Sequence, residues 1–238
     1  MAAVDRNAAA LGVPLRALME SSGNAVARRV RELTTAGDAV ALVCGRGNNG
    51  GDALVAARFL DDRDVTVHLL GRPESLTTDI ARANWDALQA AEIETEIVAD
   101  SRDFALGDPD LVVDAMLGTG ITGDLREPEA SAARAIDDAA APVLAVDVPS
   151  GVDADATEPD AASEDAVEAE HVVTFHDLKP ALAEHPDVTV ADIGIPVAAA
   201  ELVGPGDVAV IGEGGSRKGD SGRTFVIGGG PYTGAPAL

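Results

Sequence analysis

Short apolar stretches that run directly into loops rich in glycine or acid constrain the fold of this chain more than any other feature. Three stretches contain only apolar residues, as expected for strands buried on both faces: residues 39–43, 111–113 and 143–146. Each is followed by a loop that carries glycines, acids or amides: residues 45–52, 114–124 and 147–153. Ligands of α/β proteins bind at the carboxyl ends of strands, so we expect these loops to form a binding site.

Helical patterns alternate with the apolar stretches. From Pro14, apolar residues recur at helical spacing as far as Leu33. Further helices are predicted at residues 52–60, 78–91 and 130–140. Further strands are predicted at residues 65–70, 172–175, 188–191 and 208–211. Alternating strands and helices favour parallel pairing with right-handed crossovers. We therefore predict an α/β fold of three αβα layers around a Rossmann-like, doubly wound, mostly parallel sheet.

The chain is strongly acidic, with a net charge of −24 over 238 residues. Disordered acidic segments have few apolar residues, whereas this chain is 46% apolar. Binding to nucleic acid or to an anionic membrane would require the opposite surface charge. We interpret the composition as that of a folded, halophilic protein whose self-repulsion is screened in a salt-loaded cytoplasm.

The sequence shows no sign of disulfide bonds or of a membrane-spanning helix. Cys44 is the only cysteine, which excludes an intrachain disulfide and a metal site built on paired cysteines. No apolar run approaches the roughly 18 residues of a membrane-spanning helix. We therefore expect a cytoplasmic protein that contacts neither membrane nor nucleic acid.

The loop at residues 45–52 combines glycines with Asn48, Asn49 and Asp52. Its glycines would let the backbone approach a ligand, and the start of the following helix would offer free N–H groups to an anion. The spacing also fits the dinucleotide-binding pattern G-x-G-x-x-G, which on its own is weak evidence. That pattern usually requires an acid after the second strand, where this chain has Gly71-Arg72. An arginine there could instead accept a 2′-phosphate.

The other two loops supply oxygen ligands. Asp114 follows the stretch at 111–113, and helix capping would explain it as well as a functional role would. Asp147 ends the stretch at 143–146 and precedes Ser150. Together with Asn49, the side chains of Asp114 and Ser150 form an oxygen set that suits a hard cation better than zinc or iron.

Taken together, these motifs resemble the YjeF N-terminal domain family of NAD(P)H-hydrate epimerases. The resemblance rests on three segments: Gly-Asn-Asn-Gly-Gly-Asp at 47–52, Asp-Ala-Met-Leu-Gly-Thr-Gly at 114–120 and Asp-Val-Pro-Ser-Gly-Val-Asp at 147–153. Flanking pieces agree, and the resemblance covers roughly residues 1–211. One departure is Ser21-Ser22-Gly23, where the family usually has Asn-Ala-Gly.

The resemblance implies a metabolite-repair isomerase that interconverts the R and S forms of hydrated NADH and NADPH (NADHX and NADPHX) at C6. The implied substrate-binding residues, besides Asp147, are Asn48, Asn49, Gly50, Gly51, Asp52, Gly118, Thr119, Gly120, Ile121, Thr122, Gly123 and Asp124. One potassium ion per subunit would be held by Asn49, Asp114 and Ser150. Asp147 would be the catalytic acid and base, with Lys179 as a possible helper. A homodimer is also implied.

A second resemblance concerns the end of the sequence. We expect residues 1–212 to form the epimerase domain. Residues 213–238 resemble a linker and the opening strand and glycine loop of an ADP/ATP-dependent NAD(P)H-hydrate dehydratase, a ribokinase-like domain. About twenty residues cannot build a core of their own, so the chain is expected to lack dehydratase activity.

Two alternatives from other functional classes remain. One is a non-catalytic module of the same fold that binds nucleotides or proteins, and the intact Asp147 argues against it. The other is an NADP-dependent oxidoreductase, which the absence of a Tyr-x-x-x-Lys motif disfavours.

Overall fold

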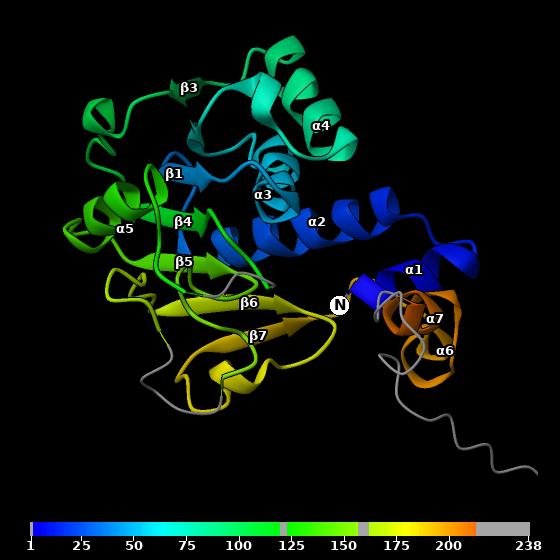
Figure 1. Cartoon of the computed structure of the whole chain (residues 1–238). Coiled ribbons are helices and arrows are strands. Elements are labelled where there is room, and N and C mark those ends of the chain that lie inside the picture. The colour runs from blue at the N-terminus through cyan, green and yellow to red at the C-terminus, as the bar shows by residue number, and fades with distance from the viewer. Residues whose placement is uncertain (1, 120–122, 157–161, 213–238) are drawn as a thin grey trace, which may run out of the picture. The chain divides into compact units, whose positions relative to one another are not determined.

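The computed structural model describes residues 2–119, 123–156 and 162–212 and divides into two compact units (Figure 1). One unit, Val13–Ile195, contains the sheet. The other combines Met1–Gly12 with Pro196–Leu238. Its described helices are α1 (Ala2–Ala10), α6 (Val197–Glu201) and α7 (Pro205–Gly212). In the described part of the chain, no helix is both long and apolar enough to cross a lipid bilayer.

The sheet has seven strands in the order β3-β2-β1-β4-β5-β6-β7, and every neighbouring pair is parallel. The strands are β1 (Ala39–Cys44), β2 (Asp64–Leu70), β3 (Thr95–Val98), β4 (Leu111–Ala115), β5 (Val143–Val146), β6 (His171–Phe175) and β7 (Val188–Ala191). The chain moves outward from β1 to β3 and then outward in the opposite direction from β4 to β7. This is the doubly wound order, so the predicted fold class is confirmed.

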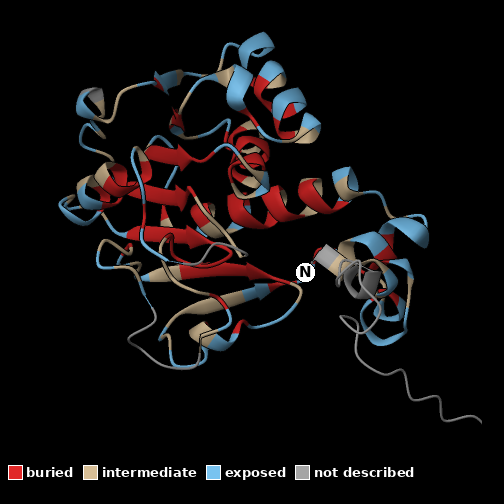
Figure 2. Cartoon of the chain, in the orientation of Figure 1, coloured by how far each residue is buried: buried red, intermediate tan, exposed pale blue. Residues whose placement is uncertain are grey.

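Helices cover the sheet in layers. They are α2 (Leu15–Leu33), α3 (Asn48–Phe59), α4 (Asp79–Ala90) and α5 (Glu129–Asp137), with short 3₁₀ turns at Pro73–Ser75, Ser101–Asp103 and Pro180–Leu182. Right-handed crossovers place α3 and α4 on one face and α5 on the other, because the two halves of the sheet are wound in opposite directions. The middle strands β1, β4 and β5 are buried along nearly their whole length (Figure 2).

Close helix packing depends on small residues. A β-carbon at Gly23 of α2 would lie 2.4 Å from the Val55 side chain of α3, so these helices touch backbone to side chain at this point. Ser22 is buried beside Gly23 and donates its hydroxyl to the Leu18 carbonyl. A serine at position 22 is therefore accommodated within α2.

Two predictions about elements were wrong, and some elements, α1 and β3 among them, were not predicted. Residues 208–211 were expected to be a strand, but they belong to α7. Their apolar run fits either structure, and Pro205 at the first position favours a helix. The third strand along the chain, β3, was not predicted, because its residues Thr95 and Glu96 make it polar. Finally, α3 begins at Asn48 rather than at residue 52, so residues 48–52 of the predicted loop are helical.

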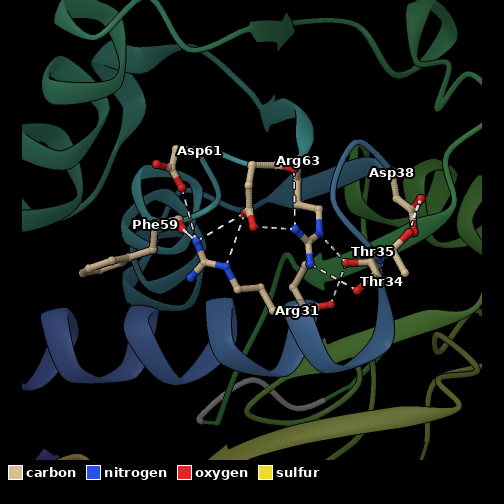
Figure 3. Close-up of polar contacts among 9 residues, drawn as sticks. Arg31, Thr34, Thr35, Asp38, Phe59, Asp61 and Arg63 are labelled. Carbon is tan, nitrogen blue, oxygen red and sulfur yellow. Dashed lines mark hydrogen bonds and ion pairs between the residues drawn. The ribbon is translucent and has the colours of Figure 1, made fainter.

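Charged side chains connect the segments that lead into the amino ends of β1 and β2. The Arg31 guanidinium donates to the Phe59 carbonyl and lies 3.3 Å from the Asp61 carboxylate (Figure 3). Arg63 donates from Nε to the Thr34 hydroxyl at 2.8 Å. The network joins the ends of α2 and α3, at the opposite edge from the three loops.

Candidate active site

The loops after β1, β4 and β5 meet at the carboxyl edge of the sheet. These three strands are consecutive neighbours and parallel, so their ends lie side by side. The strand order reverses between β1 and β4, which is where doubly wound sheets open a crevice for ligands. The three loops therefore lie side by side, whereas ligand binding by them stays a prediction.

Glycines allow the first two loops to touch through their backbones. A β-carbon at Gly45 would lie 1.8 Å from the Met116 carbonyl oxygen, and one at Gly50 would lie 2.0 Å from the Gly45 oxygen. Both distances are impossible for any other residue. The Gly45 N–H also donates to the Ala115 carbonyl at 3.0 Å. These glycines are therefore needed for packing, whatever ligand the loop binds.

The loop after β1 passes at once into α3. Gly47 is the N-cap residue and supplies no side chain to the free N–H groups of the first turn. Asn48 is exposed on this turn, whereas Gly50 and Gly51 are buried. The helix start thus offers unpaired donors and partial positive charge to an anion.

Asp114 lies at the end of β4 with no exposed surface. Its carboxylate accepts the Ser150 hydroxyl at 2.6 Å, the Ser150 N–H at 2.8 Å and the Met116 N–H at 3.2 Å. Ser150 Oγ in turn accepts the Leu117 N–H at 3.0 Å. Burial raises the pKa of Asp114 to about 6, although these hydrogen bonds act in the opposite direction. Asp114 and Ser150 thus connect the loops after β4 and β5.

Asp147 follows β5 in a left-handed backbone conformation, with φ of 70°. Such a conformation is uncommon for a residue other than glycine, asparagine or aspartate and often occurs at functional sites. The carboxylate accepts the Thr119 N–H at 3.1 Å and the Thr174 hydroxyl at 3.3 Å, and lies 3.2 Å from Lys179 Nζ. Lys179 is itself 7% exposed and donates to the carbonyl of Phe175 at 2.7 Å.

Gly118 lies between the two halves of the site. A β-carbon there would be 3.2 Å from Asn49 Oδ1 and 3.2 Å from Asp147 Oδ2. Asn49 and Asp147 therefore approach Gly118 from two sides, although they belong to different loops. The side-chain nitrogen of Asn49 is buried and has no hydrogen-bond partner among the described residues. A buried polar atom without a partner is rare and points to a ligand or bound water.

Other predicted site residues are less central, or cannot be placed. Asp124 is exposed and Gly123 precedes it with φ of 86°. Asp52 is half-buried in the first turns of α3. Gly120, Ile121 and Thr122 lie outside the described residues.

Thr174 was missed by sequence reasoning. It is fully buried in β6 and donates to Asp147. Val146 pairs with Val173, so the next positions, Asp147 and Thr174, come side by side. A threonine in an otherwise apolar strand was visible in the sequence, but its neighbour depends on strand pairing.

The sequence matches one protein-family profile and several proteins that have names. The profile of the family described as "YjeF-related protein N-terminus" matches residues 15–181. A protein of Methanothermobacter thermautotrophicus named bifunctional NAD(P)H-hydrate repair enzyme Nnr is 44% identical, across all of this chain and 48% of its own length. The chain thus spans about half the length of this relative.

A shorter relative matches over most of its length. The protein of Cenarchaeum symbiosum named NAD(P)H-hydrate epimerase is 40% identical, across 81% of this chain and 92% of that protein. A yeast protein of known crystal structure superimposes with a TM-score of 0.62 at 25% identity, across 73% of this chain and 76% of the yeast chain. The fold, the matched profile and these relatives agree, and the chain belongs to the YjeF-related protein N-terminus family.

Proposed function

We propose that the chain epimerises hydrated NADH and NADPH at C6 of the damaged nicotinamide ring. The observation that carries the proposal is the environment of Asp147, a strand-end carboxylate in contact with Thr119, Thr174 and Lys179. It occurs in a chain 40% identical to a protein named NAD(P)H-hydrate epimerase.

The reaction needs a group that first donates and then accepts a proton. When the C6 hydroxyl accepts a proton, its C–O bond can break and the hydroxyl departs as water. The ring cation that remains is stabilised by the ring nitrogen. Water then adds to the other face of C6 and gives up a proton, so nothing is consumed overall. Asp147 is the proposed acid and base. Lys179 Nζ, 3.2 Å from Asp147 Oδ1, is the second proton-bearing group beside the proposed reaction centre.

The rest of the substrate would lie along the neighbouring loops. The start of α3 suits the pyrophosphate, since Gly47 leaves its N–H groups free. The proposed binding segments are residues 48–52 and 118–124. Asn49 lies next to Gly118, and Gly118 next to Asp147, so this path is continuous over the described part of the loops.

We also propose that potassium binds between the loops after β1, β4 and β5. The described residues fit a cation: Asp114 is completely buried, yet none of the described ion pairs involves it. The ligands would be Asp114, Ser150 and Asn49, whose amide can present its oxygen by rotation. A mixed set of carboxylate, hydroxyl and amide oxygens favours a hard ion. Bound potassium would offset the buried charge and hold the loops together.

The remaining assignments are proposals of the same kind. Residues 1–212 would form the epimerase part, in a cytoplasmic homodimer adapted to high salt. Residues 213–238, assigned by resemblance to the start of a dehydratase domain, lie outside the described residues.

A coupled assay tests the proposed reaction. The purified 238-residue chain is added to a mixture of R and S hydrates with a separate S-specific dehydratase. That dehydratase alone should consume only the S form, whereas both forms should disappear when the chain is present. Persistence of the R form would contradict the proposal and favour a non-catalytic nucleotide-binding module.

A further inference from the structure

The end of β2 carries features that the proposed chemistry does not use. Gly71 and Arg72 directly follow this strand. Arg72 borders a surface depression of about 640 Å³, which is also lined by Pro73, Glu74, Ser75, Ile97 and Ala99. The depression lies at the carboxyl ends of β2 and β3, the same edge of the sheet as the candidate active site.

The side-chain stem of a second arginine, Arg46 in the loop after β1, passes Gly71 at the end of β2. Gly71 has φ of 117°, and a β-carbon there would lie 2.9 Å from Arg46 Cδ and 3.2 Å from Ser75 Oγ. Glycine at position 71 thus leaves room for the Arg46 stem to cross the end of β2. The Arg46 carbonyl accepts the Thr77 N–H at 2.9 Å, which fastens the loop after β1 to the segment after β2.

The two arginines near the depression differ in whether another side chain already neutralises their charge. Arg46 Nη2 lies 3.3 Å from the buried Glu129 carboxylate, so part of its charge is already balanced. Arg72 is exposed, and its guanidinium forms none of the ion pairs found among the described residues. Acids outnumber Lys and Arg by 41 to 17 in this chain, so an unpaired guanidinium next to a depression is a candidate anion ligand. Guanidinium groups bind phosphate oxygens in bidentate geometry.

The sheet sets the distance from this depression to the proposed reaction centre. The strands run in the order β2-β1-β4-β5, so three strand spacings separate the end of β2 from Asp147. At about 4.8 Å each, they span about 14 Å, comparable with an extended dinucleotide. With the damaged ring at Asp147 and the pyrophosphate at the start of α3, the adenosine ribose would reach the end of β2.

We propose that Arg72, assisted by Arg46, binds the 2′-phosphate of hydrated NADPH, so that the chain prefers the phosphorylated hydrate to hydrated NADH. The proposal rests on the proposed function and specifies its substrate. Glu74 is the carboxylate in the lining. Glu74 opposes the phosphate, so the attraction comes mainly from Arg72, whose charge no described ion pair balances.

The test compares Arg72→Ala with Arg28→Ala in the full 238-residue chain. Arg28 is also exposed, but it lies on α2, toward the helix end that leads into the start of β1. We expect Arg72→Ala to lower the ratio of kcat/KM for hydrated NADPH to that for hydrated NADH at least about 10-fold, through KM, because a charge-assisted hydrogen bond is lost. Arg28→Ala should keep the wild-type ratio.

Calorimetric titration with NADP⁺ and NAD⁺ gives a readout that does not depend on turnover. The wild type should bind NADP⁺ more tightly, and this advantage should shrink at high KCl and in Arg72→Ala. Glu74→Gln should strengthen NADP⁺ binding by removing a like charge. An unchanged NADP⁺ advantage in Arg72→Ala would overturn the proposal.

The outcomes separate this proposal from the proposed function. If wild type epimerises neither hydrate but binds NADP⁺ through Arg72, the epimerase proposal fails and the phosphate subsite stands. If both hydrates turn over equally well in wild type and in Arg72→Ala, the subsite proposal fails alone. Weaker NAD⁺ binding in Glu74→Gln would also overturn it, since the depression would then hold an unphosphorylated ribose through Glu74.

Discussion

Two carboxylates at neighbouring strand ends, Asp114 near the end of β4 and Asp147 directly after β5, have very different surroundings. Asp114 has no exposed surface and accepts only neutral donors, from Ser150 and Met116. Asp147 is 9% exposed and has a cation, Lys179, 3.2 Å away. The same residue type at the carboxyl ends of two neighbouring strands is thus completely enclosed in one case and, in the other, buried with a small exposed surface beside a lysine.

The difference indicates which carboxylate can meet a substrate. A catalytic acid and base must reach the reacting group, which Asp147 can do and the enclosed Asp114 cannot. A completely buried carboxylate without a cationic side chain, by contrast, is stabilised by a bound cation. This difference is why we propose proton transfer for Asp147 and ion binding for Asp114.

The largest expected effect is that of Asp147→Asn. The amide has nearly the same shape but cannot donate and accept the proton, so epimerisation should slow at least about 10²-fold. The coupled assay measures the rate, and circular dichroism checks that the fold is kept. Near-normal turnover would break the comparison and transfer the role to Asp114 or Lys179.

Asp114→Ala should instead act mainly on stability. The substitution leaves the Ser150 hydroxyl, the Ser150 N–H and the Met116 N–H without their acceptor. Relief of the buried charge offsets part of this loss, so we expect the free energy of unfolding to fall by about 2 kcal/mol. Urea titration measures it, with the exposed Asp86→Ala on α4 as the control. Equal midpoints for the two variants would mean that Asp114 does not hold the loops together.

Potassium should stabilise the fold through Asp114, and the size of this effect should depend on pH. Burial raises the pKa of Asp114 to about 6, so the folded state holds this proton more tightly than the unfolded state. Without a cation, the contribution of Asp114 to stability therefore decreases as pH rises from about 4 to about 6. Potassium competes with the proton, so it should stabilise the chain more above this window than below it.

The measurement is the melting temperature in KCl and in choline chloride of equal concentration. At about pH 7.5 potassium should raise it by about 2–4 °C, the shift expected for roughly 1 kcal/mol in a chain of this size. At about pH 5 the difference should be smaller, and Asp114→Ala should abolish it. A potassium effect of equal size in Asp114→Ala would place the ion elsewhere.

Much of the fold could be predicted because central strands of a parallel sheet are buried on both faces. Residues 39–43 and 143–146 are uniformly apolar for this reason, and both were predicted as strands. The edge strand β3 is largely exposed, so its sequence lacks that pattern. Residues 208–211 were assigned to a strand because a short apolar run does not distinguish a strand from a helix.

The site could be predicted in part. The rule that ligands bind at strand ends was enough to bring the three loops together. It could not supply contacts that depend on strand register or backbone path. The Thr174 hydroxyl reaches Asp147 because β6 pairs with β5, and Lys179 reaches it from beyond the end of β6. The start of α3 at Asn48 was also not predicted, because glycines usually indicate a loop.

Thr174→Val should have the smallest effect. Valine has nearly the same shape and suits a buried strand, so the change removes little except the hydroxyl that donates to Asp147 Oδ1 at 3.3 Å. This hydrogen bond is long, and Asp147 keeps its contacts with the Thr119 N–H and Lys179. We therefore expect kcat to fall only about 3- to 10-fold, the range for one hydrogen bond of roughly 1 kcal/mol.

The matched control for that variant is Thr189→Val on β7, which removes a strand hydroxyl from a residue paired with Val173 rather than one that contacts Asp147. The control should keep the wild-type kcat. A loss in Thr174→Val as large as that in Asp147→Asn would mean that the hydroxyl takes part in proton transfer itself. No loss at all would mean that Thr119 and Lys179 are enough to orient the carboxylate. Either result would change the proposed difference between Asp147 and Asp114. After a large loss, Asp147 and Thr174 would act as a pair in proton transfer. After no loss, Lys179 would be the side chain that distinguishes the two carboxylates.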